Sequence, residues 1–427
     1  MKAKLAYGRT PLEVTLPDDR VAKCMTFRDM PPIEQPTAVL NGALNEPIHS
    51  PPLIELAQGK NNACVVISDI TRPVPNQVIL PPILQSLEEA GVPRENVLIL
   101  VATGLHRPST PEERIEMCGE EIVANYRIED HYAENREEHT YLGDSPRGVP
   151  VWIDSRYLNA ELKIITGLIE SHFMAGFSGG RKAICPGICA KETIAEWHKP
   201  RFLEHENAKS GQITDNPVHE EGTWIAKKAG CDFLVNVVMN SERQIVGIVA
   251  GDMETAYDRG VEIARELVVD TLPEPVDIVV TGGGGYPLDQ TWYQTIKGIV
   301  TALDILKPGG TIIIASSCAE GLGCTQFDEI TAKFPTIDDF MTAILNDKFF
   351  VINQWQLEEL GKVLRKGRVV VVTDSITPET LKRMYVESAP TVEQAVQEAL
   401  SRYGDTAKIA VLPDGPYVLA QVKKGAM

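Results

Sequence analysis

Residues 162–198 read LKIITGLIESHFMAGFSGGRKAICPGICAKETIAEWH and join an apolar strand pattern to a dense run of reactive side chains. Residues 162–169 are mostly apolar and rich in isoleucine, which is typical of a buried β-strand. His172 follows the predicted strand. The same stretch then contains a glycine-rich turn, Lys182 and His198. In α/β sheets ligands bind beyond the carboxyl ends of the strands, so we expect the chemistry of this protein here.

Three other segments have the same form as this strand. Residues 63–69, 96–104 and 277–285 are apolar runs that end in Ser-Asp or Thr-Gly. They alternate with amphipathic helical patterns, and this alternation predicts an α/β protein with mainly parallel sheets flanked by helices.

The length of 427 residues predicts two domains rather than one core. The sequence TLPEPVD at 271–277 is the expected boundary, because two prolines follow a helical pattern there. We therefore expect an N-terminal domain over 1–270 and a C-terminal domain over 271–407. The strands of 408–427 are expected to return to the N-terminal domain, and the active site is expected in a cleft between the two domains.

Composition excludes several classes of function. A formal net charge of −18 argues against nucleic-acid binding, which needs a basic surface. No apolar run reaches the roughly 20 residues that cross a bilayer, and the first residues lack the apolar segment of a signal peptide. We expect a cytoplasmic protein with reduced cysteines and no membrane or nucleic-acid partner.

His106 and His172 follow two different predicted strands. Histidine is the natural proton acceptor near neutral pH, and inversion of a stereocentre needs a base on each face of the carbon. Either histidine alone could be an ordinary loop residue. The pair favours a racemase or epimerase over a one-sided dehydrogenase.

The turn FSGGRK at 177–182 has the pattern of a helix N-terminus, with Ser178 as the cap and Gly179 and Gly180 allowing close backbone approach. Such ends bind phosphate through their N–H groups, although an ordinary tight turn has the same composition. Lys182 should stay near the end of a short helix. His198 is expected on a helix over 190–205, where a metal would need its other ligands from elsewhere.

Two polar groups could hold a substrate. Asp69 and Arg72 lie on a proline-stiffened loop after a strand, where the arginine suits a carboxylate and the aspartate could simply pair with it. Tyr293, Gln294 and Lys297 share one face of a predicted helix. The glycine run at 282–285 also allows a dinucleotide site, but the GxGxxG spacing is absent.

These motifs together resemble the nickel-dependent lactate racemase family, whose members use a nickel-pincer nucleotide. The resemblance covers nearly the whole chain and rests on segments in family order: SDITRP (68–73), TGLHRP (103–108), ESHFMAGFSGGRK (170–182), WHKPRFLEH (197–205) and YQTIK (293–297). It implies an isomerase that interconverts D- and L-lactate, or a similar small 2-hydroxy acid, by hydride transfer.

The resemblance also implies roles for individual residues. Lys182 would bond covalently to the cofactor, His198 would be a nickel ligand, and Ser178, Gly179 and Gly180 would lie against the nucleotide. His106 and His172 would be the acid/base pair. The implied substrate-orienting residues are Arg72, Asp69, Tyr293, Gln294, Lys297 and Trp355. Cofactor-synthesis proteins would be the partners that load the enzyme.

Other interpretations stay open at this point. The substrate could be another 2-hydroxy acid or a sugar-like compound, since family members differ in substrate. A non-catalytic carrier of the nickel nucleotide would need Lys182 and His198 but has no use for paired bases. A nicotinamide-dependent dehydrogenase fits the residues least well.

Overall fold

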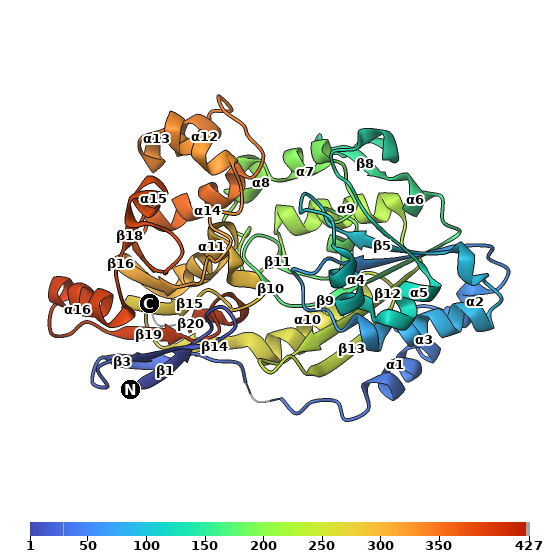
Figure 1. Cartoon of the computed structure of the whole chain (residues 1–427), viewed down its shortest axis with the longest axis horizontal. Coiled ribbons are helices and arrows are strands. Elements are labelled where there is room, and N and C mark those ends of the chain that lie inside the picture. Colours follow the sequence, from blue (N-terminus) through green and yellow to red (C-terminus); the bar gives the residue numbers. More distant parts are fainter. Residues whose placement is uncertain (29, 424–427) are drawn as a thin grey trace. The chain divides into compact units, whose positions relative to one another are not determined.

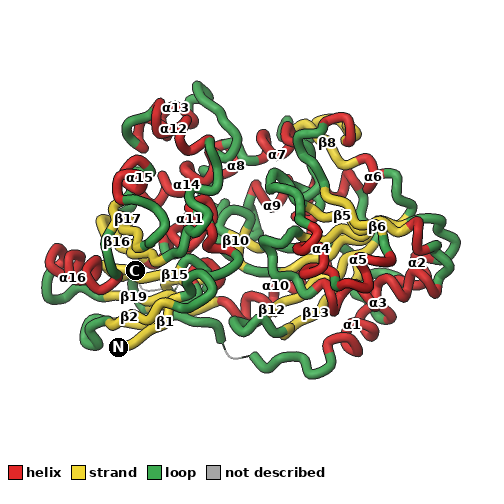
Figure 2. The backbone as a smooth tube through the Cα atoms, in the orientation of Figure 1, coloured by secondary structure: helices red, strands yellow, loops and turns green. Residues whose placement is uncertain are grey.

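The computed structural model describes residues 1–28 and 30–423 of the chain. Contacts divide the chain into two compact units. The N-unit consists of Asp29–Phe202 and Glu206–Leu267, and the C-unit of Met1–Arg28, Leu203–His205 and Val268–Met427. Each contains a six-stranded sheet flanked by helices, which confirms the α/β prediction (Figures 1 and 2). Among the described residues, no helix is both long and apolar enough to span a bilayer.

The N-unit sheet has the strand order β13-β12-β9-β4-β5-β6. Its strands are β4 (Ala63–Ser68), β5 (Val97–Ala102), β6 (Arg127–Asp130), β9 (Leu162–Leu168), β12 (Phe233–Met239) and β13 (Ile245–Gly251). All neighbours are parallel except β12 and β13. The central strands read as continuous apolar runs because both faces of a parallel sheet are buried.

Helices and short elements complete the N-unit. The helices are α1 (Pro36–Asn45), α2 (Leu53–Ala57), α3 (Asn76–Glu89), α4 (Pro111–Cys118), α5 (Glu120–Asn125), α6 (Ser155–Leu158), α7 (Lys191–Trp197), α9 (Pro217–Ala229) and α10 (Thr255–Val268), while α8 (Pro200–Leu203) ends where the chain enters the C-unit. Side chains of α1 and α3 share one apolar core with β4 and β5. Two hairpins, β7 (His139–Asp144) with β8 (Pro150–Asp154) and β10 (Ser171–His172) with β11 (Gly176–Phe177), lie outside the main sheet.

The strand order places a topological switch point in the N-unit beside β4. After β4 the chain adds β5 and β6 on one side of it, and later adds β9 and β12 on the other side. In doubly wound sheets ligands bind in the crevice at the carboxyl ends of the strands where the order reverses. The loops after β4, β5 and β9 carry the predicted site residues of this unit, so the topology gathers them at one edge.

The C-unit sheet has the order β18-β17-β16-β15-β19-β3, and all its neighbours are parallel. Its strands are β3 (Val21–Cys24), β15 (Val276–Gly282), β16 (Leu306–Ala315), β17 (Arg368–Val372), β18 (Glu387–Ser388) and β19 (Ile409–Leu412). The pairs β1 (Lys2–Leu5) with β2 (Leu12–Thr15) and β14 (Val269–Leu272) with β20 (Leu419–Val422) lie beside it. The helices are α11 (Trp292–Thr301), α12 (Gln326–Lys333), α13 (Ile337–Leu345), α14 (Gln354–Leu364), α15 (Pro378–Arg383) and α16 (Val392–Tyr403).

Short 3₁₀ turns connect several of these elements: η1 (Arg94–Asn96), η2 (Arg136–Glu138), η3 (Gly180–Ala183), η4 (Leu288–Gln290), η5 (Leu303–Ile305) and η6 (Gly415–Tyr417).

The C-terminal strands do not return to the N-terminal part, contrary to the expectation for 408–427. β19 pairs with β15, and β20 pairs with β14, so residues 408–423 complete the C-unit, while 424–427 lie outside the described residues. The N-terminal strand β3 pairs with β19 and so also belongs to the C-unit. Apolar terminal strands carry no sequence signal for which sheet edge they will join, and the prediction failed there.

The glycine run after β15 packs against the chain itself. A Cβ added to Gly282 would lie 2.7 Å from Pro413 O, and one added to Gly283 would lie 2.5 Å from Ser316 Oγ. The glycines are therefore needed for close backbone packing. This packing weighs against the dinucleotide site that the run had left open.

Candidate active site

Asp69 and His106 form a hydrogen-bonded pair above β4 and β5. His106 Nδ1 lies 2.7 Å from Asp69 Oδ2, and Thr71 Oγ1 donates to Asp69 Oδ1 at 2.7 Å. Burial alone would raise the pKa of Asp69, but the bonds from His106 and Thr71 and the charge of Arg72 lower the pKa overall. The ionised carboxylate accepts the Nδ1 proton, which leaves Nε2 of a neutral His106 as a base.

Arg72 pairs with Glu170 and not with Asp69. Arg72 Nη1 donates to Glu170 Oε1 at 3.0 Å, and the two side chains are only 21% and 13% exposed. Arg72 follows β4 and Glu170 follows β9, so the pair joins the two loops at the switch point. The pairing of Asp69 with Arg72, considered from the sequence, is therefore not the one that forms.

His172 is held in the opposite tautomer from His106. Its Nδ1 accepts hydrogen bonds from the backbone N–H groups of Met174 (3.3 Å) and Ala175 (3.2 Å). A nitrogen that accepts carries no proton, so the proton of a neutral His172 ring is on Nε2. This local turn is made by the β10–β11 hairpin directly after β9.

The turn after the hairpin differs from the predicted helix N-terminus. Residues Gly180–Ala183 form the 3₁₀ turn η3, Ser178 Oγ donates to Leu168 O at 2.7 Å, and Gly180 N–H donates to Asn236 Oδ1 at 2.8 Å. Gly179 and Gly180 have positive φ angles of 74° and 55°. A Cβ on Gly180 would lie 2.6 Å from the Tyr257 ring, so a side chain is excluded there. The Ser178 hydroxyl and the N–H groups of Ser178 and Gly180 therefore have partners within the protein.

Lys182 is partly buried on this turn. Its Nζ lies 5.3 Å from the centroid of the Trp197 ring. Burial, together with the charges of Arg181 and Arg72, lowers the pKa of Lys182 to about 7. At neutral pH the amine of Lys182 is therefore unprotonated far more often than that of an ordinary lysine, which favours its action as a nucleophile.

His198 lies at the C-cap of α7 and not within one long helix over 190–205. Pro200 starts the separate helix α8, because proline cannot continue the hydrogen bonds of α7. His198 Nδ1 donates to Ile194 O at 2.8 Å, and burial, with a smaller effect of Lys182, lowers the pKa of His198 to about 3. The neutral ring thus has an unprotonated Nε2, which is the form that binds metals.

In the C-unit, α11 carries Tyr293, Gln294 and Lys297. Trp355 of α14 contacts Tyr293. Trp355 Nε1 donates to Tyr293 OH at 2.8 Å. Lys297 is 9% exposed. Gln294 Oε1 is buried and accepts no hydrogen bond within the part of the chain that the structure describes. A buried acceptor without a donor is unfavourable unless a ligand satisfies it.

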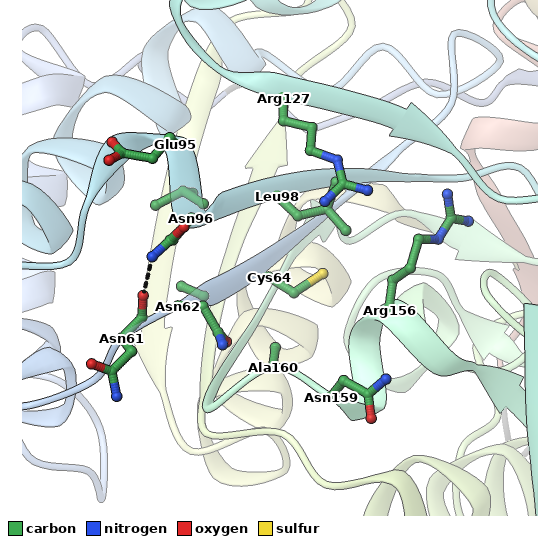
Figure 3. A pocket seen from close by; sticks show the side chains of 12 residues that line it. Asn61, Asn62, Cys64, Glu95, Asn96, Leu98, Arg127, Arg156, Asn159 and Ala160 are labelled. Carbon is green, nitrogen blue, oxygen red and sulfur yellow. Dashed lines mark hydrogen bonds between the residues drawn. The ribbon is translucent and has the colours of Figure 1, made fainter.

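A separate cavity of about 350 Å³ lies at the amino-terminal edge of the N-unit sheet, opposite the loops described above. Figure 3 shows Arg127, Arg156 and Cys64 among its lining residues. Both guanidinium groups are already paired with carboxylates, Arg127 with Glu129 and Arg156 with Glu129 and Asp154. The cavity therefore offers polar walls but little uncompensated charge.

Sequence reasoning missed Glu170, Asn236 and Arg181 as parts of the site. The buried Arg181 donates to Ala175 O and Phe177 O at 2.9 and 3.0 Å and shapes the loop before Lys182. Glu170 could have been found, because it follows a strand end as His172 does. Asn236 lies within β12, and its role depends on a contact across the sheet that sequence spacing does not reveal.

The chain is similar to proteins of one family along most of its length. The family model for the lactate racemase N-terminal domain matches residues 7–211, and the model for the lactate racemase C-terminal domain matches residues 272–420. Lactate racemase from Lactiplantibacillus plantarum is 37% identical over 382 residues, which is 89% of each chain. Lactate racemase from Thermoanaerobacterium thermosaccharolyticum is 36% identical over 428 residues, covering 98% of this chain and 99% of that protein.

Two solved structures are similar to this one. The lactate racemase apoprotein from Thermoanaerobacterium thermosaccharolyticum matches with a TM-score of 0.92 at 35% identity, over 99% of this chain and 100% of the other. A protein from Thermotoga maritima matches with a TM-score of 0.70 at 18% identity, over 91% of this chain and 98% of that one, and shows a shared fold only.

Proposed function

We propose that this chain, which belongs to the lactate racemase family, interconverts D- and L-lactate or a closely similar 2-hydroxy acid. The observation that carries the proposal is a pair of histidines at the switch point whose Nδ1 atoms make opposite kinds of hydrogen bond, one to a carboxylate and one from backbone N–H groups. His106 follows β5 and His172 follows β9, on the two sides of β4. Two histidines placed in this way could act as an acid/base pair, with neutral His106 as the base and His172, once protonated, as the acid.

The two histidines would exchange protons with the substrate hydroxyl. In the resting enzyme His106 Nε2 is the atom able to take the hydroxyl proton as the substrate is oxidised to a planar 2-keto acid. When the hydrogen returns to the other face, a protonated His172 can give its Nε2 proton to the keto oxygen and become neutral, which first requires Nδ1 to release the N–H groups of Met174 and Ala175. After one such turnover the protonation states are reversed, and the reaction can run in the opposite direction.

The residues around Lys182 and His198 fit a bound nickel-pincer nucleotide. Neutral Lys182 is suited to covalent attachment, and the unprotonated Nε2 of His198 is suited to a metal that prefers imidazole and sulfur donors. When bound, the group would supply the acceptor and donor of hydride. The hydrogen bonds of Ser178 and Gly180 shape the turn that carries Lys182, and we propose that this turn, with Gly179, lies against the nucleotide. We propose that cofactor-synthesis proteins load the group.

The substrate would be oriented through its carboxylate and oxygen atoms. Arg72 presents a guanidinium at the strand ends of the N-unit, which suits a carboxylate. In the C-unit we propose Lys297 and the unsatisfied Gln294 as further orienting residues, with Tyr293 fixed by Trp355. Asp69 would act on His106 and not on the substrate.

The test is racemisation by protein made in a host that synthesises the cofactor. Conversion of each lactate enantiomer would be followed by chiral chromatography, with mass spectrometry of the peptide containing Lys182. We expect equal mixtures from either enantiomer and a nucleotide-sized adduct that Lys182→Ala lacks. Retention of deuterium from the carbinol carbon in the product would support hydride transfer. Free exchange of that deuterium with water would contradict it, and loaded protein inactive on lactate and on other 2-hydroxy acids would contradict the proposed function.

His198 is tested by metal content. His198→Ala should fold and retain the Lys182 adduct but lose most of its nickel, since the variant removes the proposed imidazole donor. The exposed His205, seven residues later in the chain, provides the matched control His205→Ala, which should keep its nickel. Stoichiometric nickel in His198→Ala would remove His198 from the metal site.

A further inference from the structure

The pair formed by Arg72 and Glu170 spans the switch point of the N-unit sheet. The central strands β4 and β9 are parallel neighbours in register from Ala63 opposite Leu162 to Val66 opposite Ile165. Arg72 follows β4, Glu170 follows β9, and their side chains meet at 3.0 Å where both are largely buried. The pair therefore fixes two loops relative to each other at the edge where ligands bind in this class of sheet.

The backbone of Glu170 is held from both sides by Ser178. Glu170 N–H donates to Ser178 Oγ at 3.0 Å, and Ser178 N–H donates to Glu170 O at 2.9 Å. The Ser178 hydroxyl in turn donates to Leu168 O at 2.7 Å, at the end of β9. These bonds remove most of the backbone freedom of Glu170, so its carboxylate has a defined position before any ligand arrives.

Glu170 engages only a small part of the hydrogen-bonding capacity of Arg72. A guanidinium has five N–H donors, and among the described residues only Glu170 accepts from the side chain of Arg72, through Nη1. The nearby Arg181 differs, because its two terminal nitrogens donate to the backbone oxygens of Ala175, Phe177 and Gly179 and to Tyr257 OH. Arg181 is a structural arginine, whereas Arg72 is oriented but keeps donors for a ligand.

We propose that Glu170 is a positioning residue that orients Arg72 so that its remaining N–H groups receive the substrate carboxylate. This rests on the proposed function, because it takes the substrate to be a small 2-hydroxy acid. Glu170 does not itself contact the substrate in this arrangement. Its negative charge would repel a carboxylate if the two came together, so its benefit must come through the orientation of Arg72.

The position of Glu170 also predicts what kind of ligand the site rejects. A second negative charge on the substrate, as in a dicarboxylic 2-hydroxy acid, would need a further cation, while Glu170 already offsets part of the charge of Arg72. The arrangement therefore favours monocarboxylates. Malate should be a poorer substrate and a poorer ligand than lactate.

The test is a double-mutant cycle on cofactor-loaded enzyme with Glu170→Ala, Arg72→Ala and the double variant. We expect Glu170→Ala to raise the KM for lactate about tenfold with kcat changed less than about threefold, the size expected for one charge-assisted hydrogen bond. In the Arg72→Ala background the removal of Glu170 should have little further effect, because its partner is gone. Glu170→Gln, which keeps an acceptor for Nη1, should show a smaller rise in KM.

Controls separate positioning from folding and from the proposed function. Glu134→Ala removes the exposed partner of Lys191 in the same unit and should leave KM unchanged. Calorimetric binding of 2-hydroxy-2-methylpropanoate, which has the same carboxylate and hydroxyl but no transferable hydrogen, measures the same effect without turnover. If wild-type enzyme fails to racemise lactate but binds this analogue in a Glu170-dependent way, the proposed function fails and the positioning role stands.

Three results would overturn the proposal. The first is an unchanged KM in Glu170→Ala that retains wild-type thermal stability. The second is a lowered KM, which would show that Glu170 competes with the substrate for Arg72. The third is a rise in KM on removal of Glu170 that is equally large in the presence and absence of Arg72, which would show that Glu170 acts through another group.

Discussion

The Nδ1 atom of His106 lies 2.7 Å from Oδ2 of the buried Asp69, and the Oδ1 atom of the same carboxylate accepts a hydrogen bond from Thr71. The carboxylate therefore fixes which ring nitrogen of His106 carries the proton. Because Asp69 follows β4 and His106 follows β5, the adjacent parallel strands set this geometry. The relationship supports our proposal that Asp69 acts through His106, whereas the resemblance had implied a substrate contact for Asp69.

Asp69→Asn should lower kcat by about 10²- to 10⁴-fold with little loss of stability, because an amide can donate to Nδ1 and favour the wrong tautomer. Racemisation rates on loaded enzyme, with the Lys182 adduct and nickel content confirmed, measure the effect. Thr71→Val is the matched comparison, since it removes one bond to Asp69 but leaves the carboxylate in place, and we expect a smaller loss. A kcat for Asp69→Asn near that of the wild type would contradict the role assigned to Asp69.

The opposite tautomers of His106 and His172 predict an asymmetric first half-reaction. Both His106→Ala and His172→Ala should lose racemisation by at least about 10²-fold, because a full cycle uses both residues. His172→Ala should still form 2-keto acid in a single turnover from one enantiomer, since His106 starts as a base. His106→Ala should not form it from that enantiomer. Rapid acid quench with detection of the keto acid measures this, and equal yields from both enantiomers in both variants would contradict the assignment.

The lowered pKa of Lys182 predicts selective reactivity in protein that lacks the cofactor. An amine-reactive reagent should modify Lys182 with a rate that rises through a midpoint near pH 7, whereas ordinary lysines titrate near 10.4. Arg72→Ala should raise the midpoint, because the charge of Arg72 is one cause of the shift. Peptide mapping across pH 5–10 measures both values. A midpoint above about 9 in the wild type would show that burial does not affect this amine.

Two adjacent buried carboxyl groups in the C-unit predict a loss of stability as the pH rises. Burial and the neighbouring Glu359 raise the pKa of Glu358 to about 9. Burial raises the pKa of Glu359 to about 7, although Lys362 acts in the opposite direction. Both groups ionise near 4.5 in an unfolded chain, so above that pH the folded state holds more protons. The free energy of unfolding should therefore fall as the pH rises from about 4.5 towards 9, by at most about 1.4 kcal/mol per pH unit for each group.

Glu358→Gln tests this prediction, because it keeps the shape of the side chain and cannot ionise. Urea unfolding at several pH values from 6 to 9 should show a clearly flatter dependence for the variant than for the wild type. The exposed Glu379 provides the control Glu379→Gln, which should follow the wild type. Identical slopes in the wild type and Glu358→Gln would mean that Glu358 is already ionised in the folded protein.

Much of the fold could be predicted from local patterns. Buried parallel strands are continuous apolar runs, so β4, β5, β9 and β15 were visible as such, and the alternation with helices indicated the α/β class. The same patterns placed Asp69, Arg72, His106 and His172 after strand ends. Helix ends were less well predicted: the expected helix over 190–205 is interrupted because Pro200 follows the C-cap His198.

By itself the sequence determined the class of fold, the strand ends that carry reactive side chains and the residues in which the chain resembles its family. Only the tertiary structure decided which of those side chains meet. Asp69 pairs with His106, 37 residues away, and Arg72 pairs with Glu170, 98 residues away. The cause is the strand order, in which β4 lies between β5 and β9 and so brings loops from distant parts of the sequence to one edge. The strand order also places β19 in the C-unit, where it pairs with β15 and β3. Which sheet an apolar terminal strand joins depends on the edges that the rest of the folded chain leaves open, so the local sequence does not predict it.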